Sequence, residues 1–443
     1  MKIRQFISVF SLCMLSLSSL LAQPVNYRFD FGEGVPAKGY LKILPEDKYT
    51  SEKGFGFISG TELVSVTRHG KDILRTDYIT SKQPFYFSVD IPDGDYNVTV
   101  YLGDEEGTSS QTIRVECRRL MVHQLATPEK MVVAKQFTVH KRSVVINGKE
   151  KVLIKESEKD YLHWDNQLTF EFNGTNPKIC GLVIEKTAKP ITVFLAGNST
   201  VVDQVREPWA AWGQMIPSFF VPGKVVVANY GESGETLKAF QREKRLDKIW
   251  SMAKKGDYLF IEFAHNDQKS GINFVDPFTS YTAMLKEYIA EARKRGIHPV
   301  LVTSMLRRNF DDQGKIVNTL GDYPEAMRRC GKEMGVTVID LNAMSRVLYE
   351  TWGPKESLKA FVHYPANTFP GVARELKDDT HFNPYGAYML ARCVASGITD
   401  QHLGISKYLK EKFRHFDPSK PDLPDSFVWP LSPQVGALKP EGN

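Results

Sequence analysis

In residues 23–188, hydrophobic and polar positions alternate along the chain with a period of two. Residues 85–91 and 96–102 each place apolar side chains at every second position, and a Pro-Asp-Gly turn separates them. Residues 168–172 repeat the alternation before an Asn-Gly pair. The pattern predicts a β-hairpin over residues 85–102 and an all-β sandwich for the whole segment.

Beyond residue 190 the pattern changes to short, continuous apolar runs that alternate with helical periodicity. The runs occupy residues 191–195, 225–228, 258–263, 299–302 and 336–339. Runs of this kind are typical of parallel strands that are buried on both faces. Apolar residues in 281–292 follow a helical period, and Asn383 before Pro384 is a helix-start pattern. We therefore expect an α/β domain with a parallel sheet.

The two ends of the chain have different patterns. Lys2 and Arg4 precede an uncharged apolar run that ends at Leu21, which is shorter than the roughly 20 residues of a membrane span. We read an export signal and expect a periplasmic or secreted protein. After residue 405 the chain is charged and then proline-rich, and we expect an extended tail held by Phe427, Val428 and Trp429. The expected segments are a signal peptide at 1–22, a sandwich domain at 23–188, an α/β domain at 191–405 and a tail at 406–443.

The composition is that of a globular protein and excludes several classes. Of 443 residues, 42% are hydrophobic and 25% are charged, which excludes a disordered chain, a coiled coil and a collagen. The net charge of +5 is mild, whereas nucleic-acid binding calls for a concentrated basic face, so we expect no nucleic-acid partner. Four cysteines follow the predicted signal peptide and form no C-x-x-C motif. We expect them to be small buried residues and expect no metal.

Polar clusters lie at the ends of the predicted strands, where the carboxyl ends of parallel strands meet at one edge. The clusters are Gly197-Asn198-Ser199-Thr200, residues 229–234, Ala264-His265-Asn266-Asp267 and Asp378-Asp379-Thr380-His381. Each cluster alone is an ordinary cap or turn. Together they contain the groups that acyl transfer requires.

A serine hydroxyl becomes a nucleophile when a base takes its proton, and histidine is the usual base near neutral pH. An acidic residue on the other ring nitrogen holds the correct tautomer. Asp378 and His381 are three positions apart, so one loop can bring the two side chains together. Glycine and asparagine can supply N–H donors for the negative oxygen of the tetrahedral intermediate.

This ordered set of blocks resembles the SGNH (GDSL-type) hydrolase superfamily over about 191–405. The resemblance implies a three-layer, flavodoxin-like α/β fold with a five-stranded parallel sheet and no cofactor. It implies a catalytic triad of Ser199, Asp378 and His381. It also implies an oxyanion hole formed by Ser199, Gly234 and Asn266.

Finer features resemble the rhamnogalacturonan acetylesterase branch of this superfamily. They are Trp212-Gly213-Gln214-Met215, His265-Asn266-Asp267, the Asp378-x-x-His381 block and the long segment before it. Two positions depart from the branch pattern: Ala264 stands where a glycine is usual, and Glu235 stands where relatives often carry arginine. The second departure leaves substrate contacts near Glu235 open.

Other residues are weaker candidates. His265, Arg307, Arg308 and His363 are candidate substrate-binding residues, and each has a structural alternative. The β-rich segment resembles galactose-binding-like sandwiches, and its aromatics, such as Tyr161 and Trp164, either stack on sugars or pack in a core. Ser233 is a weaker alternative nucleophile, because no base accompanies it in the sequence.

We therefore expect a secreted carbohydrate esterase that removes acetyl groups from pectic polysaccharide, most specifically rhamnogalacturonan. One alternative keeps the fold but changes the ester to xylan acetate, a pectin methyl ester or a lipid. A second alternative is a metal-dependent hydrolase that uses Asp203, His265, Asp267, Asp379 and His381, although their spacing matches no metal motif. A third is a glycan-binding protein without catalysis. The expected partner is an acetylated polysaccharide or oligosaccharide, without a membrane span in the mature chain.

Overall fold

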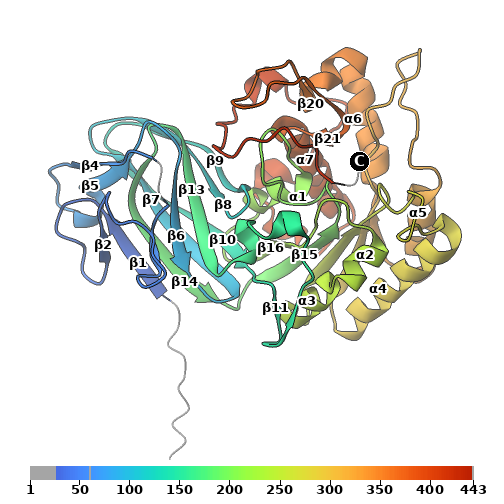
Figure 1. Cartoon of the computed structure of the whole chain (residues 1–443), viewed down its shortest axis with the longest axis horizontal. Coiled ribbons are helices and arrows are strands. Elements are labelled where there is room, and N and C mark those ends of the chain that lie inside the picture. The colour runs from blue at the N-terminus through green and yellow to red at the C-terminus, as the bar shows by residue number, and fades with distance from the viewer. Residues whose placement is uncertain (1–25, 59–60, 442–443) are drawn as a thin grey trace, which may run out of the picture.

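The computed structural model describes residues 26–58 and 61–441. The predicted signal peptide at 1–22 lies outside these residues. A β-rich part built from the N-terminal half packs directly against an α/β part built from the C-terminal half (Figure 1). In the described part of the chain, every helix is too short or too polar to span a membrane.

The β-rich part is a sandwich of two mostly antiparallel sheets. One sheet has the order β10-β7-β14-β1-β2, with β5 beside β14 and β4 beside β5; the other has the order β3-β6-β13-β8-β9. Apolar side chains from both sheets form one closed core. The strands of the first sheet are β1 (Asn26–Phe31), β2 (Leu41–Ile43), β4 (Val64–Thr67), β5 (Asp77–Thr80), β7 (Gly94–Asp104), β10 (Met131–Lys141) and β14 (Lys178–Thr187). Those of the second are β3 (Phe55–Phe57), β6 (Phe85–Asp90), β8 (Ser109–Val115), β9 (Arg119–Thr127) and β13 (Gln167–Thr175).

The hairpin predicted over residues 85–102 is wrong. The two strands form as expected, but β6 pairs with β3 and β13, whereas β7 pairs with β10 and β14 in the opposite sheet. Phe87 on β6 and Val98 on β7 both point into the same core from the two sides. A sequence that alternates on both arms fits a hairpin and a crossing between sheets equally well, because either arrangement buries one face of each strand.

The α/β part contains a five-stranded parallel sheet, as predicted, with the order β16-β15-β17-β18-β19. All four neighbouring pairs are parallel. The strands are β15 (Ile191–Gly197), β16 (Val225–Asn229), β17 (Tyr258–Glu262), β18 (His298–Val302) and β19 (Thr337–Ile339). The helices are α1 (Trp212–Met215), α2 (Leu237–Arg242), α3 (Arg245–Met252), α4 (Thr282–Lys294), α5 (Tyr323–Met334), α6 (Leu341–Glu356) and α7 (Pro384–Asp400).

Helices cover both faces of this sheet and make three layers. Val193 and Leu195 of β15 point into a core with α1, α6 and α7, while Phe194 and Ala196 point into a second core with α2, α3, α4 and α5. Both faces of the strand are therefore apolar, which explains the continuous apolar runs in the sequence. The predicted start of α7 is confirmed, because the Asn383 side chain accepts a hydrogen bond from the N–H of Gly386.

The Asp378–His381 block lies on a strand rather than in a loop. The segment β21 (Leu376–Phe382) pairs antiparallel with β20 (Phe361–Tyr364), and it leads directly into α7. A second two-stranded ribbon, β11 (Val145–Ile146) with β12 (Glu150–Lys151), projects from the sandwich beside α3 (Figure 1).

The C-terminal segment is not simply extended, since it contains three short 3₁₀ turns. Phe427 and Trp429 pack against the large core, as expected, and the Arg114 guanidinium lies 4.1 Å from the Trp429 ring. The Val428 side chain is exposed, and instead its carbonyl accepts a hydrogen bond from Gln124. The segment therefore contacts both parts of the molecule.

Candidate active site

Ser199 lies in the turn that follows β15. The Asn198 side-chain oxygen accepts hydrogen bonds from the N–H and the hydroxyl of Thr200. The Asn198 carbonyl accepts from the N–H groups of Val201 and Val202, so the chain forms one helical turn here. This turn holds the Ser199 hydroxyl at the carboxyl end of β15, an inner strand of the sheet, where parallel sheets carry their sites.

The structure brings Ser199, His381 and Asp378 into one hydrogen-bonded chain. His381 Nε2 lies 2.8 Å from Ser199 Oγ, although the two residues are 182 positions apart. His381 Nδ1 lies 2.7 Å from Asp378 Oδ2. These distances are within the range for proton transfer from a hydroxyl to an imidazole that a carboxylate orients.

Asp378 is held as a carboxylate by its surroundings. Burial by itself raises the pKa of Asp378, but the hydrogen bond and charge of His381 outweigh burial and lower the pKa well below its usual range. The N–H groups of Thr380 and His381 also donate to Oδ1, and Trp209 Nε1 donates to Oδ2 at 3.4 Å. An ionised Asp378 keeps a proton on His381 Nδ1 and leaves Nε2 able to accept the serine proton.

Gly234 and Asn266 lie in the loops that follow β16 and β17. Gly234 has a φ of +80°, a left-handed conformation that favours glycine. Asn266 Nδ2 donates to the Glu235 carbonyl at 3.1 Å, while Lys269 Nζ donates to Asn266 Oδ1 at 2.9 Å. The two bonds fix which way the amide points, and they leave the second N–H of Nδ2 for another acceptor.

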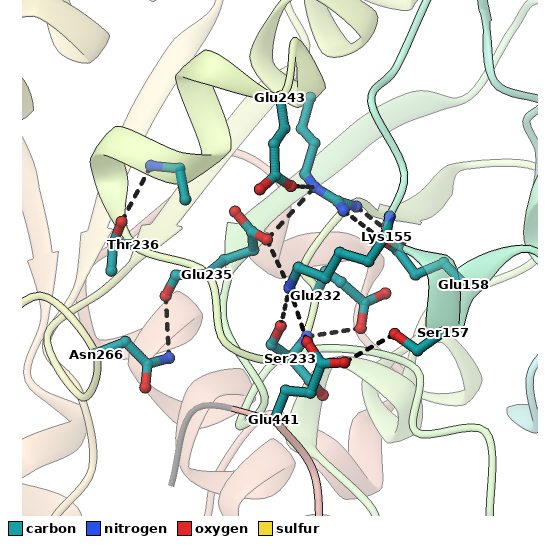
Figure 2. A network of polar contacts seen from close by, with 12 residues as sticks. Lys155, Ser157, Glu158, Glu232, Ser233, Glu235, Thr236, Glu243, Asn266 and Glu441 are labelled. Atoms are coloured by element: carbon teal, nitrogen blue, oxygen red, sulfur yellow. Dashed lines mark hydrogen bonds and ion pairs between the residues drawn. The ribbon is translucent and has the colours of Figure 1, made fainter. Parts of the chain in front are cut away.

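Glu235, the residue that departs from the branch pattern, has a partner from the sandwich side of the molecule. Lys155 Nζ lies 2.9 Å from Glu235 Oε1 and also donates to the Ser233 carbonyl (Figure 2). Burial raises the pKa of Glu235 to about 7, although Arg245 and Lys155 act against it. The other departure, Ala264, is a buried core residue. Neither departure disturbs the Ser199–His381–Asp378 chain.

The candidate substrate-binding residues divide into two groups. His265 is fully buried, with Nε2 3.0 Å from the Met305 carbonyl, and Arg307 donates to the His265 carbonyl and to Thr319. Burial lowers the pKa of His265 well below its usual range. His265 and Arg307 therefore make contacts within the protein that favour their structural alternatives over substrate binding.

Arg308 and His363 both contact Asp379, each at 2.8 Å from Oδ1. The Asp379 side chain is half-exposed. Asp379 thus belongs to a separate ionic group at the edge of the site, and Asp378 is the carboxylate that faces His381.

Glu262 is a buried residue of the site that the sequence analysis missed. Trp212 Nε1 donates to Glu262 Oε2 at 2.6 Å, and burial raises the pKa of Glu262 to about 7. The Thr200 hydroxyl lies 3.0 Å from Glu262 Oε1 and 2.8 Å from Asn198 Oδ1, yet it has one hydrogen to donate. A protonated Glu262 that donates to Thr200 satisfies all three groups. A glutamate at the end of the apolar run 258–263 is the signal that marks it.

The five residues of the metal alternative do not form a ligand cluster. Within residues 26–58 and 61–441, the group able to hold a metal ion is instead Glu158, His163 and Glu232, whose ligand atoms lie within 4.8 Å of one another. Both oxygens of Glu158 already contact the Arg245 guanidinium. A metal ion there meets a positive charge in direct contact with its ligand, so the donor set does not suit a cation.

Trp164 is buried between the two parts of the molecule and does not offer a face for sugar stacking. It packs near Tyr230, and the Arg142 guanidinium lies 4.3 Å from its ring. Tyr161 is partly buried against the same core. Core packing is therefore the correct alternative for Trp164.

A cavity of about 250 Å³ opens beside the Ser199–His381–Asp378 chain. Trp209 and Asp378 form part of its wall, and Arg374 and Lys439 bring positive charge to it. Lys439 Nζ lies 3.5 Å from Asp378 Oδ1. Lys377 and the carboxylate of Glu375 also line the cavity, so it combines an aromatic surface with both cations and carboxylates next to Asp378.

Comparison with known proteins finds similarity over both parts of the molecule. The family described as GDSL-like Lipase/Acylhydrolase matches residues 195–388, and a galactose-binding-like domain described for β-agarase and YxiM esterase-like proteins matches residues 27–125. The chain is 43% identical over 223 residues to the rhamnogalacturonan acetylesterase RhgT of Bacillus subtilis, which covers 50% of this chain and 95% of RhgT.

A second relative extends over both parts of the molecule. The uncharacterized esterase YxiM of Bacillus subtilis is 24% identical over 410 residues, which covers 89% of this chain and 97% of YxiM. The crystal structure of YxiM covers 86% of this chain and 99% of its own, with a TM-score of 0.44 and 22% identity. Together, the fold, the matched family and the similarity to RhgT over nearly all of its length establish that the chain belongs to the GDSL-like lipase/acylhydrolase family and is a carboxylic ester hydrolase.

Proposed function

We propose that this protein is an exported carbohydrate esterase that removes O-acetyl groups from pectic polysaccharide, specifically rhamnogalacturonan, through an acetyl-serine intermediate. The observation that carries the mechanism is the continuous chain from Ser199 Oγ through His381 to Asp378, with distances of 2.8 and 2.7 Å. The apolar run in residues 1–22 supports export. The mechanism requires no metal or other cofactor.

In the first half-reaction, His381 Nε2 accepts the proton of Ser199 as Oγ attacks the acetyl carbonyl carbon. The carbonyl oxygen becomes negative, and the N–H groups of Ser199, Gly234 and Asn266 stabilise it. The C–O bond to the sugar then breaks, and the departing sugar oxygen takes the proton from His381. The products are a free sugar hydroxyl and an acetyl group on Ser199.

In the second half-reaction, a water molecule takes the place of the sugar. His381 accepts a proton from this water, and the resulting hydroxide attacks the acetyl carbonyl. The same three N–H groups stabilise the second tetrahedral intermediate. When it collapses, Ser199 Oγ takes the proton back from His381, and acetic acid leaves and releases its remaining proton to the solvent as acetate. Asp378 stays ionised throughout and stabilises the imidazolium form of His381.

Two observations favour a pectic substrate. RhgT, a rhamnogalacturonan acetylesterase, shares 43% of its residues with this chain over 95% of its length. The cavity beside Asp378 is lined by Arg374, Lys377 and Lys439, which outnumber the carboxylates of Glu375 and Asp378, and cations of this kind suit the carboxylates of a uronate-containing polymer. Arg308 and His363, which both contact Asp379, form a separate polar group on the other side of β21.

The test is acetate release from a panel of acetylated rhamnogalacturonan, homogalacturonan and xylan, with Ser199→Ala as the inactive control. We expect the rhamnogalacturonan rate to exceed the other rates, and Ser199→Ala to lose nearly all activity on every substrate. A higher rate on acetylated xylan than on rhamnogalacturonan would favour the alternative in which the substrate is xylan acetate. Wild-type activity in Ser199→Ala would overturn the mechanism itself.

A further inference from the structure

Two neighbouring arginines of the sandwich, Arg118 in the turn after β8 and Arg119 at the start of β9, reach into the α/β part of the molecule. Arg119 is buried, and its Nε and Nη2 atoms lie 2.9 and 2.7 Å from Asp203 Oδ2. Its Nη1 donates to the His140 carbonyl on the sandwich strand β10. Asp203 Oδ1 also accepts from Asn229 Nδ2 at 2.9 Å. A buried ion pair therefore joins the sandwich to the loop that follows Ser199.

Arg118 holds the backbone of the same loop. Its Nη1 donates to the carbonyl oxygens of Gln204 and Trp209, at 3.1 and 3.0 Å, and its Nη2 lies 2.5 Å from Glu207 Oε2. Gln214, on α1, donates back to the Arg118 carbonyl at 3.0 Å. Because a guanidinium is planar and carries several donors, these contacts fix the loop in position as well as neutralising charge.

Gln204 and Trp209, whose carbonyl oxygens accept from Arg118, also donate hydrogen bonds to Ser199 and Asp378. The Gln204 side chain donates to the Ser199 carbonyl at 2.7 Å. The Trp209 indole donates to Asp378 Oδ2 at 3.4 Å. One loop therefore connects Arg118 to both ends of the Ser199–His381–Asp378 chain.

A second cation, from the segment between the sandwich strands β10 and β13, contacts the loop that contains Gly234. Lys155 follows β12, and its ammonium donates to the Ser233 carbonyl and pairs with Glu235 (Figure 2). An atom added to Gly234 as Cβ would lie 3.4 Å from Lys155 Nζ. Since the Glu235 carbonyl accepts from Asn266 Nδ2, Lys155 lies next to two of the three proposed oxyanion donors.

The backbone that presents these arginines is itself unusual. Glu116 and Arg118 have φ values of 55° and 60°, in the left-handed region that residues with a Cβ adopt at a cost. Such conformations persist where surrounding contacts over-determine them, and they concentrate at functional sites. The buried contacts of Arg118 and Arg119 are the contacts that hold the turn in this left-handed conformation.

We propose that the sandwich is a positioning element of the active site, in which Arg118 and Arg119 position the Ser199 loop and Lys155 positions the Gly234 loop. This inference rests on the proposed function, because it takes the roles of Ser199 and Gly234 from there. A sandwich that only bound glycan would not require buried cations bonded to these two loops.

The experiment compares full-length Arg118→Met, Arg118→Lys and Lys155→Met with the wild type. Arg28→Met is the matched control, because Arg28 is an exposed arginine of the same sandwich that pairs with Glu185. Four quantities are measured for each variant: kcat and KM for p-nitrophenyl acetate, KM for the acetylated polysaccharide, and the rate at which a fluorophosphonate labels Ser199. Melting temperatures identify the variants that remain folded at the assay temperature.

We expect Arg118→Met to lower kcat for p-nitrophenyl acetate by about 10- to 100-fold and to slow serine labelling, with a smaller change in KM, because a small displacement of reacting groups costs this much. Arg118→Lys should recover part of the loss. If Arg118→Met does not fold, the kinetics of Lys155→Met test the proposal instead. The Lys155 side chain is partly exposed, so its replacement should disturb folding less. Arg28→Met should behave like the wild type.

The inference is overturned if the folded variants keep kcat for p-nitrophenyl acetate and the labelling rate within twofold of the wild type, even where KM for the polysaccharide rises. That result would make the sandwich a glycan-binding module only. Failure of the proposed function gives a different result. A wild type that labels at Ser199 but releases no acetate from pectin loses its substrate assignment, while the labelling rates still test the positioning role.

Discussion

Asp378 and Asp379 are adjacent in the chain, but their carboxylates face different partners. Asp378 Oδ2 lies 2.7 Å from His381 Nδ1 and is buried, whereas Asp379 Oδ1 contacts Arg308 and His363 and is half-exposed. Adjacent residues on a strand point to opposite sides, so β21 directs one carboxylate to the triad and the other to the edge of the site.

Because the two carboxylates have different partners, we predict that the same substitution affects kcat at Asp378 and KM at Asp379. Asp378→Asn should lower kcat by roughly 10⁴-fold on any ester, because the amide no longer selects the His381 tautomer that accepts the serine proton. Asp379→Asn should leave kcat for p-nitrophenyl acetate near the wild-type value and act on KM for the polysaccharide. Steady-state kinetics of both variants check this. Equal losses in the two variants would contradict the assignment of Asp378.

Asn266→Ala removes one proposed donor to the tetrahedral oxygen. We expect kcat to fall by about 10²- to 10³-fold with little change in KM, since the donor acts mainly in the transition state. Lys269→Met should cause a smaller loss, because Lys269 orients the Asn266 amide through its oxygen. An Asn266→Ala variant that changed only KM would place Asn266 in substrate binding instead.

The raised pKa of Glu262 leads us to predict that the free energy of unfolding falls as pH rises. Its pKa is raised to about 7 by burial, so between the unfolded value near 4.5 and pH 7 the folded state holds a proton that the unfolded state releases. The folded state binds more protons, and the free energy of unfolding therefore decreases with pH in this window, by at most about 1.4 kcal/mol per pH unit.

Glu262→Gln should remove this part of the pH dependence, because the amide can donate to Thr200 and accept from Trp212 as the protonated acid does. Urea unfolding between pH 5 and pH 8 measures the slope. The control is Glu325→Gln, an exposed carboxylate on α5, which should retain the wild-type slope. An unchanged slope in Glu262→Gln would mean that Glu262 is ionised in the folded protein.

Gly213→Ala should disturb the turn that carries Ser199, the proposed nucleophile. A Cβ at Gly213 would lie 2.2 Å from the Val201 carbonyl, which accepts from Asn229 Nδ2. The backbone must move, and we expect a loss of about 1–3 kcal/mol in stability together with a lower kcat. Gly256→Ala is the comparison, since nothing lies near its added Cβ and the cost is that of a left-handed residue. Thermal unfolding and p-nitrophenyl acetate kinetics report both effects.

The four cysteines in the described part of the chain are free and buried: Cys117, Cys180, Cys330 and Cys393. Burial raises the pKa of each of these thiols, which makes them unreactive. We expect them to resist a thiol reagent in the native protein and to react once it is unfolded. A reductant should leave the melting temperature unchanged. A fall in melting temperature with reductant would indicate a disulfide instead.

The sequence by itself determined the order and type of most elements and placed Ser199, Asp378 and His381 among the candidate residues. Periodicity depends on which faces of a strand or helix are buried, so it separates the sandwich from the α/β part without knowledge of the partners. The three-residue spacing of Asp378 and His381 is local as well, and the structure retains their pairing.

Only the tertiary structure decided which segments meet. Strands β6 and β7 alternate as a hairpin would, yet they join different sheets, because the core that buries them lies between those sheets. Arg118 and Ser199 are connected through Gln204, and no local pattern encodes a contact between segments so far apart. Long-range contacts depend on packing of the whole chain, so the burial of Arg118 and Arg119 becomes visible only in the folded molecule.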